Sequence, residues 1–381
     1  MAVYTFVVTL DPSGSPTVLT DVVSVNITAG RQAQIDNFAS ARATVTVRYP
    51  SGYVSPIASA VIGTEILIEG ERSDGAYTTT IMFGVISDVV VEYGIPYQSS
   101  VGNADYLILS VETLFAKLAR TSGTGYAMVG AAASTQLTNA ATQSGVSIDY
   151  TPAAFFTGRT LSATTVSGSW ADWLNTMAFT FNGRITEGND FLTITNYQPA
   201  AVNTTITLSD TGVVLTAPYD AITFDSLGQN YYTQIVVDPP VVASQTAFTG
   251  SAPFRNYTVQ TLNATTGQAL DLANYYLGNY STPSVALSSV HLNLNVSEVM
   301  NFVSQVCTLG ATPGAGIFGQ GTQINVAFRG TTYTCVIEGG ALSATTGQAS
   351  LTLYVSGADL NAYLILNNAV FGKLNDNKLG Y

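Results

Sequence analysis

Apolar and polar residues alternate along the first part of the chain with the period of two that is typical of β-strands. Residues 43–49 read Ala-Thr-Val-Thr-Val-Arg-Tyr and lead into a Pro-Ser-Gly turn cluster. The same period recurs over residues 65–71, 78–92 and 105–111. A series of such strands predicts an antiparallel barrel or sandwich over residues 1–111.

Helical spacing of apolar residues then replaces the alternation. Helices are predicted over residues 111–120 and 135–144. Farther on, a hairpin is predicted over residues 183–187 and 191–197, with its turn at a Gly-Asn pair. We interpret residues 112–200 as an inserted α+β domain.

The clearest helix of this domain begins at Ser169, which forms an S-x-x-D capping box with Asp172. The apolar residues that follow recur at helical spacing: Trp170, Trp173, Leu174 and Met177. Two tryptophans at this spacing could form a ligand platform, but a buried helix face requires the same stripe. We therefore expect both tryptophans in the core.

Strand patterns resume over residues 204–208, 221–225 and 231–238. Two helices are then predicted, over residues 267–277 and 298–307. The first is expected to end at Gly278 and the second to be capped by Ser297. Further strands and a tail rich in Leu and Asn close the chain, so residues 201–381 are predicted as a second β domain with connecting helices.

The two ends of the chain share a sequence pattern. Gly63-Thr64-Glu65-Ile66 parallels Gly321-Thr322-Gln323-Ile324, and residues 79–84 parallel residues 334–339, each ending in glycine. Such repeats signal repeated structural units. We therefore predict a mainly β fold in which two antiparallel β-barrels flank the middle α+β domain.

Composition narrows the possible classes of function. Charged residues make up only 9% of the chain, and 12 Lys+Arg against 24 Asp+Glu give a net charge of −12. Specific binding to nucleic acid needs clustered cations that displace counterions, and the sequence contains no such cluster. Short polar side chains lose little rotamer entropy in a contact, so this composition favours extensive protein–protein contact.

The opening Met1-Ala2-Val3-Tyr4 has neither the basic region nor the apolar core of a signal peptide. No apolar run approaches the roughly 18 residues that a membrane-spanning helix needs. We therefore expect a chain that is made in the cytoplasm and has no membrane anchor.

Few residues could support catalysis or bind a metal. The single histidine, His291, alternates with Val290 and Leu292, and we expect it at an exposed strand position without an activated nucleophile. Cys307 and Cys335 are expected to be two buried free thiols rather than a disulfide. One His and two separated Cys cannot build a zinc site of the usual Cys/His type.

Paired carboxylates can hydrolyse glycosides. The nearest groupings are interpreted as solvated strand or turn charges: Glu69 with Glu71, Asp88 with Glu92, and Glu187 with Asp190. No G-x-S-x-G, P-loop or dinucleotide fingerprint occurs, and residues 375–377 lack the Gly and Glu of a calcium loop. We predict a protein that is not an enzyme and has no catalytic, cofactor-binding or metal site.

Several segments together resemble the minor tail proteins that form the tail-tip hub of siphophages. In the first domain they include Thr28-Ala29-Gly30-Arg31, Asp36, Phe38, Ala41, Pro50-Ser51-Gly52 and residues 83–89. In the middle domain they are residues 173–178 and Asn182-Gly183-Arg184. Toward the end they are residues 269–277, 363–366, 370–374 and 379–381. The sequence departs from the family in showing no C-terminal enzymatic or receptor-binding extension, so we do not expect this chain itself to cut the cell wall or recognise the host.

The resemblance implies a structural protein of the virion, in a homotrimeric hub similar to the baseplate hub of contractile tails. Two tube-like barrels per chain would form a pseudo-sixfold ring, adapting a sixfold tail tube to a threefold tip. The implied partners are the tail tube or distal tail protein and a central tip fiber or spike protein. The ring would line the exit channel for phage DNA or tape measure protein, and acidic walls would discourage DNA from sticking.

Two other classes of protein fit the composition less well. Another virion protein, such as a distal tail ring or a capsid decoration, would share the β-rich, Thr-rich sequence but have sixfold or local symmetry. A secreted adhesin or lectin would agree with the low charge and the glycosylation sequons, such as Asn26-Ile27-Thr28. The lack of a signal peptide argues against a secreted protein.

Overall fold

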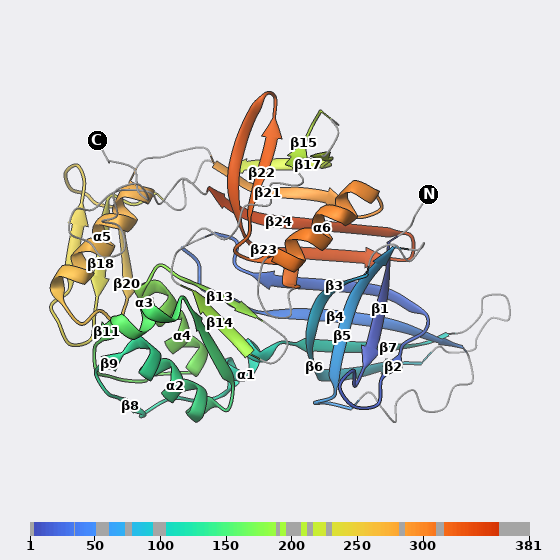
Figure 1. Ribbon diagram of the computed structural model, residues 1–381, viewed down its shortest axis with the longest axis horizontal. Coiled ribbons are helices and arrows are strands. Elements are labelled where there is room, and N and C mark those ends of the chain that lie inside the picture. Colours follow the sequence, from blue (N-terminus) through green and yellow to red (C-terminus); the bar gives the residue numbers. More distant parts are fainter. Residues whose placement is uncertain are drawn as a thin grey trace.

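The computed structural model describes residues 4–33, 35–50, 61–72, 78–93, 104–187, 191–195, 207–211, 216–225, 231–281, 286–309 and 316–357. Within these residues the fold is mainly β, and Figure 1 shows one large sheet beside a helix-rich domain and a small third group of elements. Residues 51–52 of the Pro-Ser-Gly cluster, the turn at residues 188–189, Asp190 and the segments 363–366, 370–374, 375–377 and 379–381 lie outside the described residues.

The large sheet contains fourteen strands from both ends of the chain. Its N-terminal strands are β1 (Tyr4–Leu10), β2 (Thr17–Val18), β3 (Val22–Gly30), β4 (Ala39–Pro50), β5 (Glu65–Arg72), β6 (Thr78–Glu92) and β7 (Ala104–Glu112). Its C-terminal strands are β15 (Thr207–Ser209), β16 (Thr216–Ala217), β17 (Ala221–Asp225), β21 (Ala286–Asn293), β22 (Gln323–Phe328), β23 (Thr331–Thr345) and β24 (Gln348–Gly357).

The same five-stranded topology occurs twice in this sheet. In the N-terminal β unit the strands lie in the order β3-β4-β7-β6-β5, and in the C-terminal β unit they lie in the order β17-β21-β24-β23-β22. All neighbours within both units are antiparallel. If the five strands of a unit are numbered by their order along the chain, they lie side by side in the order first, second, fifth, fourth, third in both units. The two units therefore share both connectivity and strand direction.

The open ends of the two repeated hairpins are built in the same way. At Gly63-Thr64 the Gly N–H donates to Ile86 O at 2.8 Å, and the Thr carbonyl accepts from Ile86 N–H at 2.9 Å. At Gly321-Thr322 the same two bonds reach Ile337, at 2.8 and 3.0 Å. Both glycines have a positive φ, which favours glycine over residues with a Cβ. The predicted match between the two Gly-Thr openings is therefore confirmed.

The second strands of the two hairpins align differently from what the sequence pattern predicts. That pattern matches Ile337 with Met82, whereas the hydrogen bonds match it with Ile86, four residues farther along. A register shift then follows at the same place in both copies, before Asp88 and before Gly339. The match of residues 79–84 with 334–339 is therefore wrong, because the first hairpin is longer: its paired residues Glu65 and Val85 are 20 positions apart, and the equivalent Gln323 and Val336 are 13 apart.

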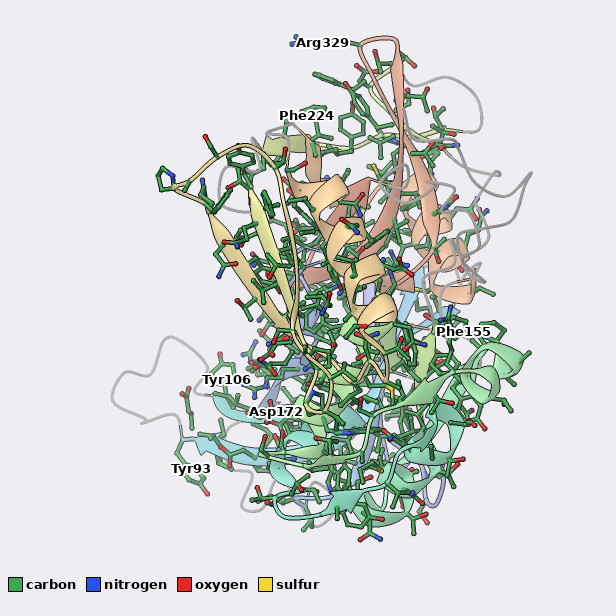
Figure 2. All side chains as sticks on the ribbon, turned by 90° about the vertical axis from the view of Figure 1, so that its left-hand side faces the viewer. Tyr93, Tyr106, Phe155, Asp172, Phe224 and Arg329 are labelled. Carbon is green, nitrogen blue, oxygen red and sulfur yellow. The ribbon has the colours of Figure 1, made fainter. Side chains whose placement is uncertain are left out.

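Strand β23 joins the two units. One edge of β23 pairs first with β22, up to Val336, and then with β3, from Gly339 to Thr345. The other edge of β23 pairs with β24. Within the described residues neither unit closes into a barrel of its own, in contrast to the two barrels predicted. Phe224 of β17 and Tyr93, which follows β6, lie far apart, as Figure 2 shows.

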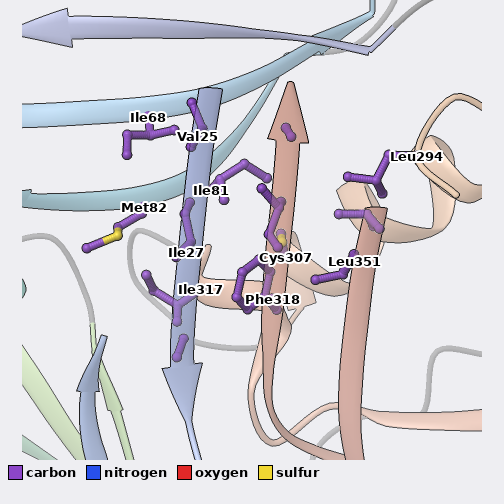
Figure 3. Close-up of a cluster of buried hydrophobic side chains, with 14 of the residues drawn as sticks. Val25, Ile27, Ile68, Ile81, Met82, Leu294, Cys307, Ile317, Phe318 and Leu351 are labelled. Carbon is purple, nitrogen blue, oxygen red and sulfur yellow. The ribbon is translucent and has the colours of Figure 1, made fainter. Parts of the chain in front are cut away.

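One hydrophobic core is common to both units. Apolar side chains from both ends of the chain pack there against helix α6 (Ser297–Leu309) and the short 3-10 helix η1 (Ile317–Gly319). Figure 3 shows side chains from β3, α6, η1 and β24 together: Ile27, Cys307, Phe318 and Leu351. The two cysteines of the chain are buried and form no disulfide, which confirms that expectation.

The middle domain has a core of its own and lies at the lower left of Figure 1. Its helices are α1 (Leu114–Arg120), α2 (Ala133–Ser144), α3 (Ala153–Gly158) and α4 (Trp170–Thr180). Its strands are β8 (Ala127–Met128), β9 (Ala131–Ala132), β10 (Ser147–Thr151), β11 (Thr160–Leu161), β12 (Thr164–Thr165), β13 (Arg184–Glu187) and β14 (Phe191–Thr195). The first helix begins later than residue 111, because β7 continues to Glu112 as a partner of β4.

Helix α4 is the helix that the sequence predicts most clearly. The Ser169 hydroxyl accepts from Asp172 N–H at 3.2 Å, and the Asp172 carboxylate accepts from Ser169 N–H at 3.0 Å, so the capping box is confirmed. Trp170 and Trp173 are only 2% and 4% exposed. Both rings therefore belong to the core rather than to a ligand platform.

A third group of elements packs around its own small core. It consists of β18 (Gln234–Asp238), β19 (Gln245–Phe248), β20 (Asn256–Gln260) and helix α5 (Thr266–Tyr280). The helix continues through Gly278 instead of ending there, and its Leu270 side chain is 39% exposed. The buried face instead carries three tyrosines: Tyr275, Tyr276 and Tyr280.

Candidate assembly surface

The junction between the two β units depends on a close approach of two backbones. Gly339 of β23 lies opposite Gly30 of β3 in the register. A Cβ added to Gly339 would lie 2.3 Å from the Ala29 carbonyl oxygen, and one added to Gly30 would lie 2.3 Å from the Glu338 carbonyl oxygen. Because both contacts are with backbone, no side chain larger than hydrogen fits at either position without moving the strands.

A buried cluster of charges holds this junction to the middle domain. Glu338 of β23 accepts from Arg31 Nε at 2.9 Å, and Arg184 Nη2 of β13 reaches its other oxygen at 3.1 Å. The Ser356 hydroxyl also donates to this carboxylate. Burial alone would raise the pKa of Glu338, but the two guanidinium groups outweigh it and lower the pKa to about 2. The glutamate therefore stays charged and ties three parts of the chain together.

A second buried carboxylate joins the middle domain to the N-terminal β unit. Glu187 accepts from the backbone N–H of Ala41 at 3.0 Å and of Phe115 at 3.1 Å, and from the Thr113 hydroxyl. Burial raises the pKa of Glu187 to about 7, against these three hydrogen bonds, which lower it. The interpretation of Glu187 as a solvated turn charge is therefore wrong, and its proposed neighbour Asp190 lies outside the described residues.

The segments that carry the resemblance meet at these contacts. The Arg31 guanidinium lies 4.1 Å from the centroid of the Phe38 ring. Phe38 N–H donates to the Asn175 side-chain oxygen at 3.0 Å, and the Asn175 amide donates back to Phe38 O at 3.3 Å. Asn182 and Tyr275 are also hydrogen-bonded side chain to side chain, at 2.5 Å. Segments that are far apart in the sequence thus position the domains relative to one another.

One face of the large sheet carries short neutral side chains. On β3, β4 and β23 the core-facing residues alternate with exposed ones, which include Asn26, Thr28, Thr44, Ser343 and Thr345. Ser343 Oγ and Asn26 Oδ1 are hydrogen-bonded at 2.8 Å across the junction between the units. The polar face therefore continues without interruption from one unit to the other.

A small number of charged side chains also lie on this polar face. Arg42 and Arg48 of β4 are exposed there, and Nε of Arg42 lies 3.7 Å from the carboxylate of Glu112. Asp88 and Glu92 of β6 are exposed, as predicted for this pair, and Glu69 and Glu71 are partly buried. Such a face offers few strong binding sites to a charged polymer that passes along it.

The remaining candidate residues do not come together as a site. His291 lies on the polar face, with its Nδ1 3.6 Å from Asp220 and its side chain 40% exposed, while Val290 and Leu292 are buried. No group of three or more His, Cys, Asp or Glu side chains gathers within the described residues. None of the described helices is long and apolar enough to cross a bilayer.

No protein-family model matches the chain, and no curated protein matches its sequence. Solved structures match its fold. The 43 kDa tail protein of prophage MuSo2 from Shewanella oneidensis has a TM-score of 0.63 at 11% identity, covering 94% of this chain and 99% of that chain. A tail protein from Neisseria meningitidis MC58 has a TM-score of 0.60 at 11% identity, with 93% and 97% covered.

A third match comes from a secretion system. The E. coli c3393 protein, a type VI secretion component with structural similarity to the T4 bacteriophage tail proteins gp27 and gp5, has a TM-score of 0.50. The identity is 9%, with 90% of this chain and 75% of that chain covered. The chain therefore has, over nearly its whole length, the fold of phage tail proteins.

Proposed function

We propose that the chain is a structural protein of a phage virion, the trimeric hub of a tail tip or baseplate. The observation that carries this proposal is the duplicated five-stranded unit within a fold that matches phage tail proteins from end to end. Three chains with two like units each offer six similar surfaces. That number suits a sixfold tail tube on one side and a threefold tip on the other.

In this proposal each domain has its own structural role. The tube-like β-barrel domains, residues 1–111 and 201–381, form the ring, in which neighbouring copies complete the barrels. The α+β domain, residues 112–200, braces the ring from outside through Glu187 and the Arg31–Glu338–Arg184 cluster. The tail tube or distal tail protein binds one end of the ring, and a central tip fiber or spike protein binds the other.

The polar face of the sheet lines the channel through which phage DNA or tape measure protein leaves the particle. Its short neutral side chains and the net charge of −12 support this assignment, because a polyanion finds few cations there to hold it. The role is structural, without catalysis or cofactor. The chain is made in the host cytoplasm and ends up in the virion.

Electron microscopy of particles that contain the chain tests this proposal. We expect three copies around the tail axis at the tip, with two similar densities per chain. Six copies in one ring would contradict the hub and favour a distal tail ring protein, while copies on the head would favour a capsid decoration.

The match to the E. coli c3393 protein raises a second candidate, the hub of a secretion machine. Purification of the assembly that contains the chain separates the two candidates. A particle with a DNA-filled head supports the phage hub, and a headless machine anchored in a cell envelope supports the secretion hub.

A further inference from the structure

The junction inside the chain provides a template for a junction between chains. The hydrogen bonds and register shifts described above make β6 equivalent to β23, with Ile86 matching Ile337 and Asp88 matching Gly339. Counting along the strands from there, Val91 matches Leu342 and Glu92 matches Ser343. In the same way β17 is equivalent to β3.

The equivalence of β17 and β3 follows from their pairing with equivalent strands. Val25 pairs with Val45 on β4, and Ile222 pairs with Val290 on β21. Val45 and Val290 in turn pair with Leu109 and Leu353, which are equivalent residues of β7 and β24. Ile222 is therefore the counterpart of Val25, Thr223 that of Asn26, and Phe224 that of Ile27.

The internal junction uses an edge whose counterpart in the N-terminal unit is only partly paired among the described strands. On β23 this edge pairs with β22 and then, from Gly339, with β3. On β6 the corresponding edge pairs with β5 up to Val85, and from Asp88 to Glu92 no other described strand pairs with it. Strand β17 likewise pairs only with β21 among the described strands, whereas its counterpart β3 has a neighbour on each side.

The core-facing side chains at the two open edges are apolar but incompletely buried, as expected of an interface whose partner is absent. At the internal junction the core-facing residues Val25, Ile27 and Leu342 are at most 2% exposed. Their counterparts on the open edges are apolar but less covered: Ile222 and Phe224 are half-buried, as is Val91, and Tyr93 is 67% exposed. An open edge with exposed apolar residues favours the addition of another strand.

We propose that β17 of one copy of the chain pairs antiparallel with β6 of the next copy. In the register of the internal junction, Glu92 lies opposite Thr223, Val91 opposite Phe224, and Tyr93 opposite Ile222, each second residue belonging to the next copy. The apolar pairs lie on the core side, and the pair of Glu92 and Thr223 lies on the polar face. This proposal names the interface of the ring and rests on the proposed hub for the number of copies.

The new junction is shorter than its template at one end. The internal junction includes the close approach of Gly339 and Gly30, but Asp88 stands at the position of Gly339. A side chain there prevents the same backbone approach, so the pairing between copies covers residues 90–93 and does not extend to Asp88.

Such a junction repeats head to tail, because each copy offers one β6 edge and one β17 edge. The two edges of a single chain lie at opposite ends of the molecule, as the labelled Tyr93 and Phe224 show in Figure 2, so they cannot pair within one copy. A repeated heterologous contact closes into a ring when its rotation allows. Alternating internal and external junctions then give a continuous sheet around the ring.

A pair of cysteines tests the register directly. In the variant Glu92→Cys with Thr223→Cys, the two Cα atoms of opposed residues would be about 4.5–5.5 Å apart, which is within the range of a disulfide. The matched control is Asp88→Cys with Thr223→Cys, since four residues along a strand add about 13 Å. The native Cys307 and Cys335 are buried and are present in both variants.

We expect mild oxidation of the full-length chain to link the first variant into dimers and then trimers, with no larger species, on a non-reducing gel. The control should stay unlinked.

A further variant, Val91→Asp, should raise the concentration needed for association about tenfold or more, with an unchanged far-UV spectrum. A chain that stays monomeric, a trimer that forms without the link, or equal linkage of the control would each overturn the proposed interface.

The outcomes for the interface and for the hub can be told apart. If microscopy finds three copies at the tail tip but the cysteines do not link, the hub stands and this interface fails. If the cysteines link into closed trimers but the chain is absent from a tail, the interface stands and the hub fails.

Discussion

At the scale of single residues, two buried glutamates show how the surroundings decide a charge. Both lose the solvation of water, which raises the pKa of a carboxyl. Glu338 faces two arginines, and they lower its pKa to about 2. Glu187 faces only neutral donors, so burial prevails and its pKa rises to about 7. One glutamate therefore stays charged across the common pH range, and the other titrates within it.

Removing one arginine from the buried cluster should destabilise the protein strongly. Arg31→Gln leaves Glu338 buried with one cation fewer, and we expect a loss of about 3–5 kcal/mol in the free energy of unfolding. Arg42→Gln is the matched control, because the Arg42 side chain is 70% exposed and 3.7 Å from its partner, and it should cost less than about 1 kcal/mol. Urea unfolding of both variants at neutral pH measures the difference. Equal losses would contradict a special role for the cluster.

The stability of the protein should also depend on pH through Glu187. Its pKa in the folded state, about 7, lies above its ordinary value of 4.5. Its contribution to stability is therefore fully present below pH 4.5 and is lost as the pH rises through about 7. Because glutamine does not titrate, the wild type should lose stability relative to Glu187→Gln across this window.

Urea unfolding of the wild type and Glu187→Gln over a series of pH values measures this loss. A constant difference between the two proteins would show that Glu187 does not titrate there. Glu338 does not obscure the result, because its depressed pKa places its own loss of stability between pH 4.5 and about 2.

The sequence alone could not predict these two roles. Glu187 precedes a Gly-Asn turn, where an exposed charge is the usual case. It is buried because Ala41 approaches from the first unit and Phe115 from helix α1 of the middle domain. Glu338 lies next to two glycines in an apolar run, and its partner Arg31 is distant in the sequence. The low content of charged residues was the one feature of the sequence that could indicate such roles. When few residues are charged, a charge inside an apolar run has to be paired or hydrogen-bonded, because burying it alone is costly.

At the scale of elements, the sequence patterns correctly predict those ends of helices and strands that depend on neighbouring residues in the chain. The alternation over residues 78–92 matches β6 at both ends, and the capping box places the start of α4 at the correct residue. The errors occur where tertiary contacts decide. Helix α5 continues through Gly278 because Tyr280, two residues beyond it, packs in the core of the small sheet together with Tyr275 and Tyr276.

Two glycines separate these local and tertiary effects. Gly278→Ala adds a Cβ that meets nothing within 4 Å in α5, so it should stabilise the protein by about 0.5–1 kcal/mol. Gly339→Ala places a Cβ 2.3 Å from the Ala29 carbonyl oxygen, and it should cost about 1–3 kcal/mol or more, since the strands must separate. Thermal or urea unfolding tests both substitutions. If Gly339→Ala is neutral, the close approach of β3 and β23 is not required.

At the scale of the whole molecule, the two units are parts of one sheet with one core. This explains why repeated strands could be detected in the sequence while the predicted pair of separate barrels was not found in the described residues. The pairing of β23 with β3 depends on a register that the sequence does not display. The outcome is a single body with an apolar side closed by α6 and a polar side that crosses both units.

The polar side supplies the last prediction, which concerns passage of DNA. Thr28, Thr44 and Thr345 are exposed on this face, so replacing all three by lysine should change stability by only about 0.5 kcal/mol per site. In particles, lysines along the channel should attract the phosphate backbone and slow DNA release several-fold at low salt, with recovery at high salt, because counterions screen the attraction.

The same three sites changed to glutamine are the matched control for size. DNA release from purified particles, followed over a range of salt concentrations, measures the effect. Release that is equally fast in the lysine and glutamine particles at low salt would mean that this face does not line the channel.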